Sequence, residues 1–150
     1  MSLMLENKQG LIAGDGILPV KMAQYAKENG FDVVCISLAK DNRAKLKKYC
    51  SKVYDCHPGE INKIENILKT EEIKQATFLG KVHKRVLLQL HKFDSRAIEL
   101  LKTIKRLNDD EVMLLIVREF EKLGITVLDQ TIFIKNLLRH KRTTRVNLKK

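Results

Sequence analysis

Short apolar runs and helical patterns alternate along almost the whole chain, and this alternation most restricts the possible fold. Five apolar runs, at residues 10–13, 32–38, 52–55, 75–79 and 125–128, have the length and composition of strands. Most of the stretches between them place apolar residues three or four positions apart, as in helices that bury one face. Such alternation produces βαβ units. The pattern therefore predicts an α/β fold with an open, mainly parallel sheet and helices on both faces.

The stretches between the runs predict the helices and the domain boundary. We expect helices at residues 19–30, 41–49, 61–68 and 108–123, another from a cap at Asp94 or Ser95 to about Leu107, and a weaker one at 132–138. A chain of 150 residues can bury one sizeable core. We therefore expect one Rossmann-like domain over residues 1–138, followed at 139–150 by a basic tail or the start of an interdomain linker.

Two glycine-containing loops follow expected strands. The first contains Gly14, Asp15 and Gly16 before a helix, and the second contains Gly80 and Lys81, with Arg85 shortly after. Parallel sheets bind ligands at the carboxyl ends of their strands, and amide groups at a helix start suit an anion. The loops therefore predict an anion or phosphate site. The alternatives are a tight turn that needs glycine and a solvated run of charge.

Asp110 is a weaker candidate, because acids are common in the first turn of a helix, where they stabilise its positive end. A metal or ligand role for this carboxylate stays open. The chain contains no P-loop, nucleophile elbow or HExxH motif. The first glycine loop also lacks the third glycine of a dinucleotide fingerprint, since Pro19 occupies that position, which argues against a dehydrogenase.

The net charge of +11 is confined to two stretches that contain no acid. Residues 81–92 hold four Lys or Arg residues, and residues 130–150 hold seven. Confined charge, 5% aromatic residues and the absence of a recognisable motif disfavour a nucleic-acid-binding domain, which remains a third interpretation. The basic surface would also suit peripheral contact with an anionic membrane.

Three cysteines without paired spacing favour a reducing compartment. Cys35 fits a buried apolar run, and the spacing of Cys50, Cys56 and His57 matches no usual zinc signature. The sequence has neither a secretory signal nor a run long enough to cross a membrane. We therefore expect a cytoplasmic protein, either free or peripheral to the inner membrane.

Four segments together resemble one enzyme family in order and spacing. They are GLIAGDGILP at 10–19, FLGKV at 78–82, FDSRAIELLK at 93–102 and NDDEVMLLIVREFEKLGITV at 108–127. The family is the LpxI-type UDP-2,3-diacylglucosamine pyrophosphatases, and the resemblance covers about residues 8 to 138. The chain departs from the family pattern at Phe78-Leu79, at His83-Lys84-Arg85 and at Asn108, which stands where the family has glycine.

The resemblance implies Mg²⁺-dependent hydrolysis of a lipid-linked UDP-sugar in lipid A biosynthesis, with release of UMP and 2,3-diacylglucosamine 1-phosphate. It also implies that this chain is the amino-terminal domain. The carboxy-terminal domain, which supplies a catalytic aspartate in the family, would then be missing, and the chain alone would be inactive. Gly14, Asp15, Gly16, Lys81, Arg85 and Asp110 are the expected substrate-binding residues. The alternative is a non-catalytic nucleotide or nucleotide-sugar binding module, and a homo-oligomer stays open.

Overall fold

The computed structural model describes residues 5–106, 108–131 and 133–135. Its strands are β1 (Lys8–Ala13), β2 (Asp32–Ser37), β3 (Lys52–Asp55), β4 (Gln75–Leu79) and β5 (Thr126–Leu128). Its α-helices are α1 (Leu18–Glu28), α2 (Arg43–Leu46), α3 (Ile61–Thr70), α4 (Ser95–Thr103) and α5 (Asp109–Lys122). Short 3-10 turns occupy Lys40–Asn42, Lys84–Leu88 and Leu90–Lys92.

The five strands form one parallel sheet in the order β3-β2-β1-β4-β5. In the centre of this sheet, Gly10 of β1 lies opposite Val34 of β2 on one side and Ala76 of β4 on the other. The chain progresses outward from β1 to β3 and then returns to β4 on the opposite side of β1. The direction of progression therefore reverses between β1 and β4, and the carboxyl ends of these two strands form a topological switch point.

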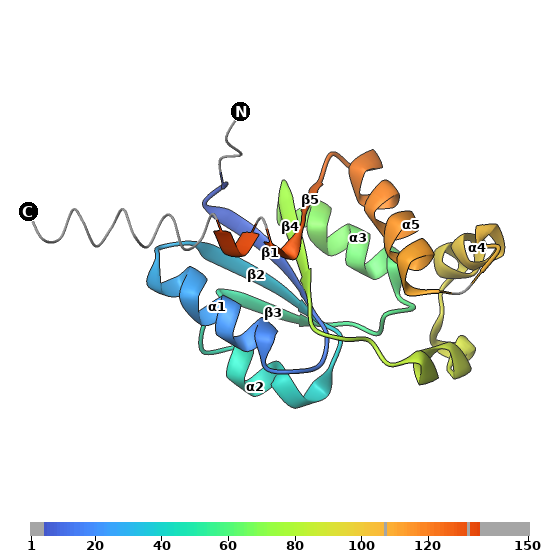
Figure 1. Cartoon of the computed structure of the whole chain (residues 1–150), viewed down its shortest axis with the longest axis horizontal. Helices are drawn as coiled ribbons and strands as arrows, with labels where there is room; N and C mark the ends of the chain where they lie inside the picture. Colours follow the sequence, from blue (N-terminus) through green and yellow to red (C-terminus); the bar gives the residue numbers. More distant parts are fainter. Residues whose placement is uncertain (1–4, 107, 132, 136–150) are drawn as a thin grey trace, which may run out of the picture.

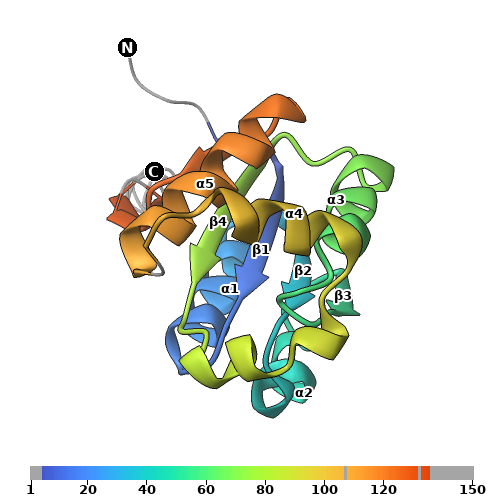
Figure 2. The ribbon, with the colours of Figure 1, turned by 90° about the vertical axis from the view of Figure 1, so that its right-hand side faces the viewer.

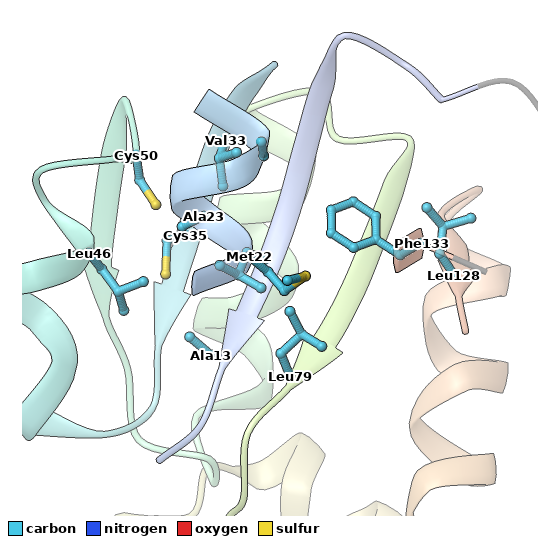
Figure 3. Packing of buried hydrophobic residues seen from close by; sticks show 12 residues of the cluster. Ala13, Met22, Ala23, Val33, Cys35, Leu46, Cys50, Leu79, Leu128 and Phe133 are labelled. Atoms are coloured by element: carbon cyan, nitrogen blue, oxygen red, sulfur yellow. The ribbon is translucent and has the colours of Figure 1, made fainter. Parts of the chain in front are cut away.

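Helices cover both faces of the sheet, as the sequence pattern predicted (Figure 1). Alternate strand residues point to opposite faces because a strand has a side-chain period of two. Leu11 and Cys35 contribute to a core with α1 and α2, which also includes Met22 and Phe133 (Figure 3). Ile12 of β1, with Val34 and Ile36 of β2, contributes to a second core with α3 and α5. Cys50 belongs to the first core and Cys56 to the second.

Several observed boundaries of helices and strands differ from the expected ones. The expected helix at 41–49 is a 3-10 turn followed by the single turn of α2. The helix expected to reach Leu107 ends at Thr103, because Ile104 has an extended backbone. The amide of Ile125 donates to the carbonyl of Phe120 and so closes α5 instead of starting β5. The weak helix at 132–138 is described only at 133–135, and the expected tail at 139–150 lies outside the described residues.

Among the described residues, no helix combines the length and the apolar character that a membrane crossing requires.

The long connection from β4 to α4 lies across the carboxyl end of the sheet (Figure 2). We call residues 82–93 of this connection the edge segment. It begins beside the end of β1 and finishes beyond the end of β3.

Candidate functional site

The two glycine loops meet directly at the switch point. The amide of Gly14 donates to the carbonyl of Leu79 at 2.8 Å. One residue further, the Asp15 amide donates to the Lys81 carbonyl at 2.8 Å, and the Lys81 amide donates to the Asp15 carbonyl at 3.0 Å. This pair forms a short antiparallel bridge between loops that leave two parallel strands. The structure therefore brings Gly14, Asp15 and Lys81 together, as expected from their positions after β1 and β4.

The approach of the loops explains two of the glycines. A Cβ on Gly14 would lie 2.6 Å from the Lys81 carbonyl oxygen, and one on Gly80 would lie 2.6 Å from the Asp15 carbonyl oxygen. Gly80 also has a φ of +87°, which side-chain-bearing residues rarely adopt. Both glycines are thus required by contact between the loops, and neither by itself indicates a ligand. Gly16 differs, because it is exposed and a Cβ there would meet nothing within 4 Å.

The Asp15 carboxylate is engaged on both oxygens. Its Oδ1 accepts a hydrogen bond from the Gly16 amide at 2.9 Å, and its Oδ2 lies 3.1 Å from His83 Nε2. The hydrogen bond from His83, followed by that from Gly16, lowers the pKa of Asp15, and the Arg85 charge contributes further. Asp15 is therefore an ionised carboxylate near neutral pH. The sequence analysis did not identify His83 as the partner of Asp15. The available signal was its position two residues after Lys81.

The Asn42 side chain holds the first glycine loop in place, and the sequence analysis did not identify this residue. This side chain is buried, and its Nδ2 donates to the Gly16 carbonyl at 2.6 Å. A second, longer contact of 3.5 Å joins Nδ2 to the Gly14 carbonyl. Asn42 ends the 3-10 turn after β2, so it fixes the loop after β1 from the neighbouring strand's connection. No sequence motif surrounds Asn42, and only the tertiary contact identifies its role.

The cationic side chains lie at the rim of this contact. The Lys81 and Arg85 side chains are exposed, and the Arg85 charge acts on Asp15. Asp110 lies on another element, in the exposed first turn of α5. The α5 cap is made by Asn108, whose Oδ1 accepts from the Glu111 amide at 2.9 Å. The loop contacts themselves are made by Gly14, Asp15, Leu79, Lys81 and His83.

The edge segment is anchored at its far end to the loop after β3. His57 Nδ1 accepts from the Gly59 amide, so the neutral ring carries its proton on Nε2 and donates to Gln89 Oε1 at 2.9 Å. The Asp94 amide donates to the Gly59 carbonyl at 3.0 Å. A Cβ on Gly59 would lie 2.6 Å from the Phe93 ring, so this approach also depends on glycine. The edge segment thus spans from the switch point to the edge strand (Figure 2).

A groove of about 600 Å³ lies at this far end, along α3. Its lining residues come from β3, α3 and the end of the edge segment, and include Tyr54, Lys63, Asn66, Lys92 and Phe93. The groove does not include either glycine loop. The carboxyl end of the sheet therefore offers two separate features, the loop pair at the switch point and the groove beside α3.

Asp15 is the carboxylate at the loop pair that could offer oxygen atoms to a magnesium ion. Among the residues that the structure describes, no group of three or more His, Cys, Asp or Glu side chains is arranged to hold a metal ion. Mg²⁺ is usually bound by one or two carboxylates together with substrate phosphates and water. Each Asp15 carboxylate oxygen has one hydrogen-bond partner and keeps a second lone pair, so Asp15 could still contribute an oxygen to Mg²⁺. A magnesium ion at the loop pair would therefore be held by Asp15 together with substrate phosphates and water.

Comparison with known proteins confirms the resemblance carried by the four sequence segments. A family model described as the LpxI N-terminal domain matches residues 8–137. The UDP-2,3-diacylglucosamine pyrophosphatase LpxI of Caulobacter vibrioides is 30% identical over 123 residues, which cover 80% of this chain and 43% of the relative. The chain thus spans less than half the length of that relative. The family match contains both glycine loops, the edge segment and α5, and the chain therefore belongs to the LpxI family through that family's N-terminal domain.

Proposed function

We propose that this domain binds the UDP-sugar part of the substrate in a UDP-2,3-diacylglucosamine pyrophosphatase. The reaction would hydrolyse the diphosphate to UMP and 2,3-diacylglucosamine 1-phosphate, a step of lipid A biosynthesis. The observation that carries the proposal is the position of the loop pair. In a member of the LpxI family, it lies at the switch point of a parallel sheet, with exposed Lys81 and Arg85 at its rim.

The charges suit a diphosphate. Lys81 and Arg85 would stabilise the negative charge of the phosphates, and Arg can bind phosphate oxygens in a bidentate manner. Asp15 would repel a nearby phosphate if its charge were unbalanced, but its ion pair with His83 offsets that repulsion when the imidazole is protonated. The exposed Gly16 backbone at the start of α1 leaves room for a sugar or phosphate group. Asp110 would contribute a hydrogen bond or a metal contact from α5.

We further propose that the chain alone hydrolyses its substrate poorly or not at all. Its span of 43% of the relative fits an enzyme whose remaining catalytic groups come from a carboxy-terminal domain. Magnesium would then be held by substrate phosphates together with Asp15 and groups from that domain. Membership of the LpxI family through its N-terminal domain supports this division.

Titration of the purified chain with UMP and with UDP, followed by NMR, tests the binding role. We expect shifts at Gly14–Gly16 and Lys81. Lys81→Ala should weaken binding about fivefold or more, which corresponds to about 1 kcal/mol. Lys69→Ala is the matched control. Lys69 is an exposed lysine near the carboxyl end of α3, and this end lies at the opposite end of the sheet from the glycine loops (Figure 2). Absence of binding, or equal affinity in both variants, contradicts the assignment.

The catalytic half of the proposal has a separate readout. UMP release from UDP-2,3-diacylglucosamine is measured with the same preparation, with and without Mg²⁺. We expect no release above background. Substantial release by phosphatase-free chain would show that the domain is catalytically sufficient and would overturn the need for another domain.

A further inference from the structure

Two of the three cysteines, Cys35 and Cys50, meet in the core that lies against α1 and α2. Cys35 belongs to β2, and Cys50 lies in the turn that leads from α2 into β3. Both thiols are free and belong to the same hydrophobic cluster. Figure 3 shows the Cys50 sulfur directed toward Cys35, whose thiol donates a hydrogen bond to it. The fold therefore holds two thiols from separate elements side by side.

The surroundings make these two thiols unequal. Cys35 is fully buried, whereas Cys50 is 9% exposed and lies at the rim of the core. Lys27 of α1 reaches the same turn, where its Nζ donates to the Lys48 carbonyl at 2.9 Å. The hydrogen bond from Cys35 lowers the pKa of Cys50 against the effect of burial, and the Lys27 charge lowers it further. The same hydrogen bond, followed by burial, raises the pKa of Cys35.

We propose that Cys35 and Cys50 form a modification site, at which a peroxide converts the two thiols into a disulfide. The Cys50 thiolate attacks one peroxide oxygen, the O–O bond breaks, and the leaving hydroxide takes up the proton that Cys50 released. The Cys35 sulfur then attacks the sulfenic acid of Cys50, so that an S–S bond forms and the hydroxyl group leaves as water with the Cys35 proton. The two thiols lose two electrons, which the peroxide takes up. A thiol reductant reverses the change, as in other transient disulfides of reducing compartments.

Cys56 provides an internal comparison within the same chain. It is 1% exposed and belongs to the second core, on the opposite face of the sheet. Burial raises its pKa to about 11. Among the described residues, that core contains no other cysteine. Cys56 therefore matches the other two thiols in burial, but it has neither a lowered pKa nor a thiol beside it.

The disulfide would close the connection between β2 and β3 into a ring. This connection contains α2 and Asn42, whose Nδ2 donates to the Gly16 carbonyl at 2.6 Å. A crosslink that keeps the native geometry stabilises the folded chain, because it restricts the unfolded chain. Oxidation should therefore raise the resistance to urea and restrain the residue that holds the first glycine loop. The inference does not depend on which ligand that loop binds.

Peptide mapping of the unchanged chain tests the site directly. The reduced, folded chain is treated with hydrogen peroxide, its remaining thiols are alkylated in urea, and its proteolytic peptides are identified by mass spectrometry. We expect a disulfide between Cys35 and Cys50 as the main product, with Cys56 alkylated. Cys50 should react at least about tenfold faster than Cys56, since the thiolate fraction falls about tenfold for each unit of pKa. A main product that includes Cys56, equal oxidation at all three positions, or no oxidation of Cys50 overturns the proposal.

Three variants separate the roles of the thiols. With Cys35→Ala, we expect Cys50 to stop at a sulfenic acid, which dimedone traps. With Cys50→Ala, we expect Cys35 to stay reduced. Cys56→Ala is the matched control and should form the same disulfide within about twofold of the unchanged rate. The absence of a trapped sulfenic acid in the first variant, or unchanged oxidation of Cys35 in the second, contradicts the order of the two steps.

Urea unfolding of the unchanged chain does not require that these core variants fold. We expect the oxidised chain to unfold at a higher urea concentration than the reduced chain, and dithiothreitol to restore the original midpoint. An unchanged midpoint, or a lower one that dithiothreitol reverses, would show that the disulfide does not fit the native packing and would overturn the proposal.

Discussion

Asp15 and Lys81 exchange two backbone hydrogen bonds, of 2.8 and 3.0 Å, across the point where the strand progression reverses. The residues are far apart in the sequence, and each follows a different strand. Their bridge ties the two loops that carry most of the candidate ligand-binding residues into one unit. Anything that separates these backbones should therefore affect both the stability of the domain and the shape of the site.

Gly80→Ala tests this close approach. The new Cβ would lie 2.6 Å from the Asp15 carbonyl oxygen, at a φ of +87°. Gly124→Ala is the control, because its φ of +81° imposes a similar backbone penalty while nothing lies within 4 Å of the new Cβ. We expect a loss of about 1–2 kcal/mol for Gly124→Ala and at least about 1 kcal/mol more for Gly80→Ala, measured by urea unfolding. Equal losses would show that the loops part without cost.

Asn42→Ala should loosen the first glycine loop without disrupting the fold. It removes the 2.6 Å hydrogen bond to the Gly16 carbonyl, and we expect about 1–2 kcal/mol lower stability together with weaker UMP binding. Asn42→Asp should be worse in both assays, because a carboxylate cannot donate to that carbonyl. Calorimetry and NMR titration measure the two effects. Unchanged UMP affinity in both variants would limit Asn42 to a purely structural role.

Asp94 caps two helices with one carboxylate. Its Oδ1 accepts from the Ala97 amide in α4 at 2.9 Å, and its Oδ2 accepts from the Asn62 amide in α3 at 2.7 Å. We expect Asp94→Ala to cost about 2 kcal/mol in unfolding free energy, since each of the two lost caps costs about 1 kcal/mol. Asn108→Ala removes a single cap, on α5, and should cost about half as much. If the two variants lose equal stability, the second capping hydrogen bond of Asp94 adds nothing to the free energy of unfolding.

Glu71 should make the stability depend on pH in the acid range. Its buried carboxylate accepts from the Tyr54 hydroxyl, from Lys52 Nζ at 2.9 Å and from Lys8 Nζ at 3.3 Å. These groups, Tyr54 first, lower the pKa of Glu71 from 4.5 to about 2. The unfolded chain therefore binds this proton more readily than the folded chain. The stabilisation is present in full above about pH 4.5 and is lost as the pH falls toward 2.

Glu71→Gln should remove part of this dependence. Urea unfolding at several pH values between 7 and 2.5 gives the comparison, and other carboxyls contribute equally to both proteins. We expect the variant to be less stable than the unchanged chain by about 1–2 kcal/mol at pH 7, with the difference shrinking below pH 4. Glu72→Gln, which alters the exposed neighbouring carboxylate, should leave the profile nearly unchanged. A constant difference at all pH values would contradict the lowered pKa.

Much of the fold could be predicted because its signals are local. The strands at 52–55 and 75–79 were predicted to the residue, since each is a short run with apolar and β-branched or aromatic residues that is followed by a segment containing glycine. The capping role of Asp94 for α4 and the cap of α5 at Asn108 also follow from neighbouring residues. The positions of Gly14, Asp15 and Lys81 after their strands sufficed to place them at one edge.

The details of the site could not be predicted because they depend on residues that meet only after folding. The pairing of His83 with Asp15 spans 68 positions, and that of Asn42 with Gly16 spans 26. Sequence reasoning also left open whether Gly14 and Gly80 serve a turn or a ligand, and the structure shows that they allow two backbones to approach. No periodicity encodes such contacts, because each is a single pair whose members have unrelated neighbours.

By itself, the sequence determined the α/β class, most element positions and the family, because apolar spacing, caps and ordered motifs are properties of adjacent residues. Only the tertiary structure decided the strand order, the bridge between the glycine loops and the path of the edge segment across the sheet. These features depend on long-range closure, in which hydrogen bonds and packing between distant segments select one arrangement among several that share the same local pattern.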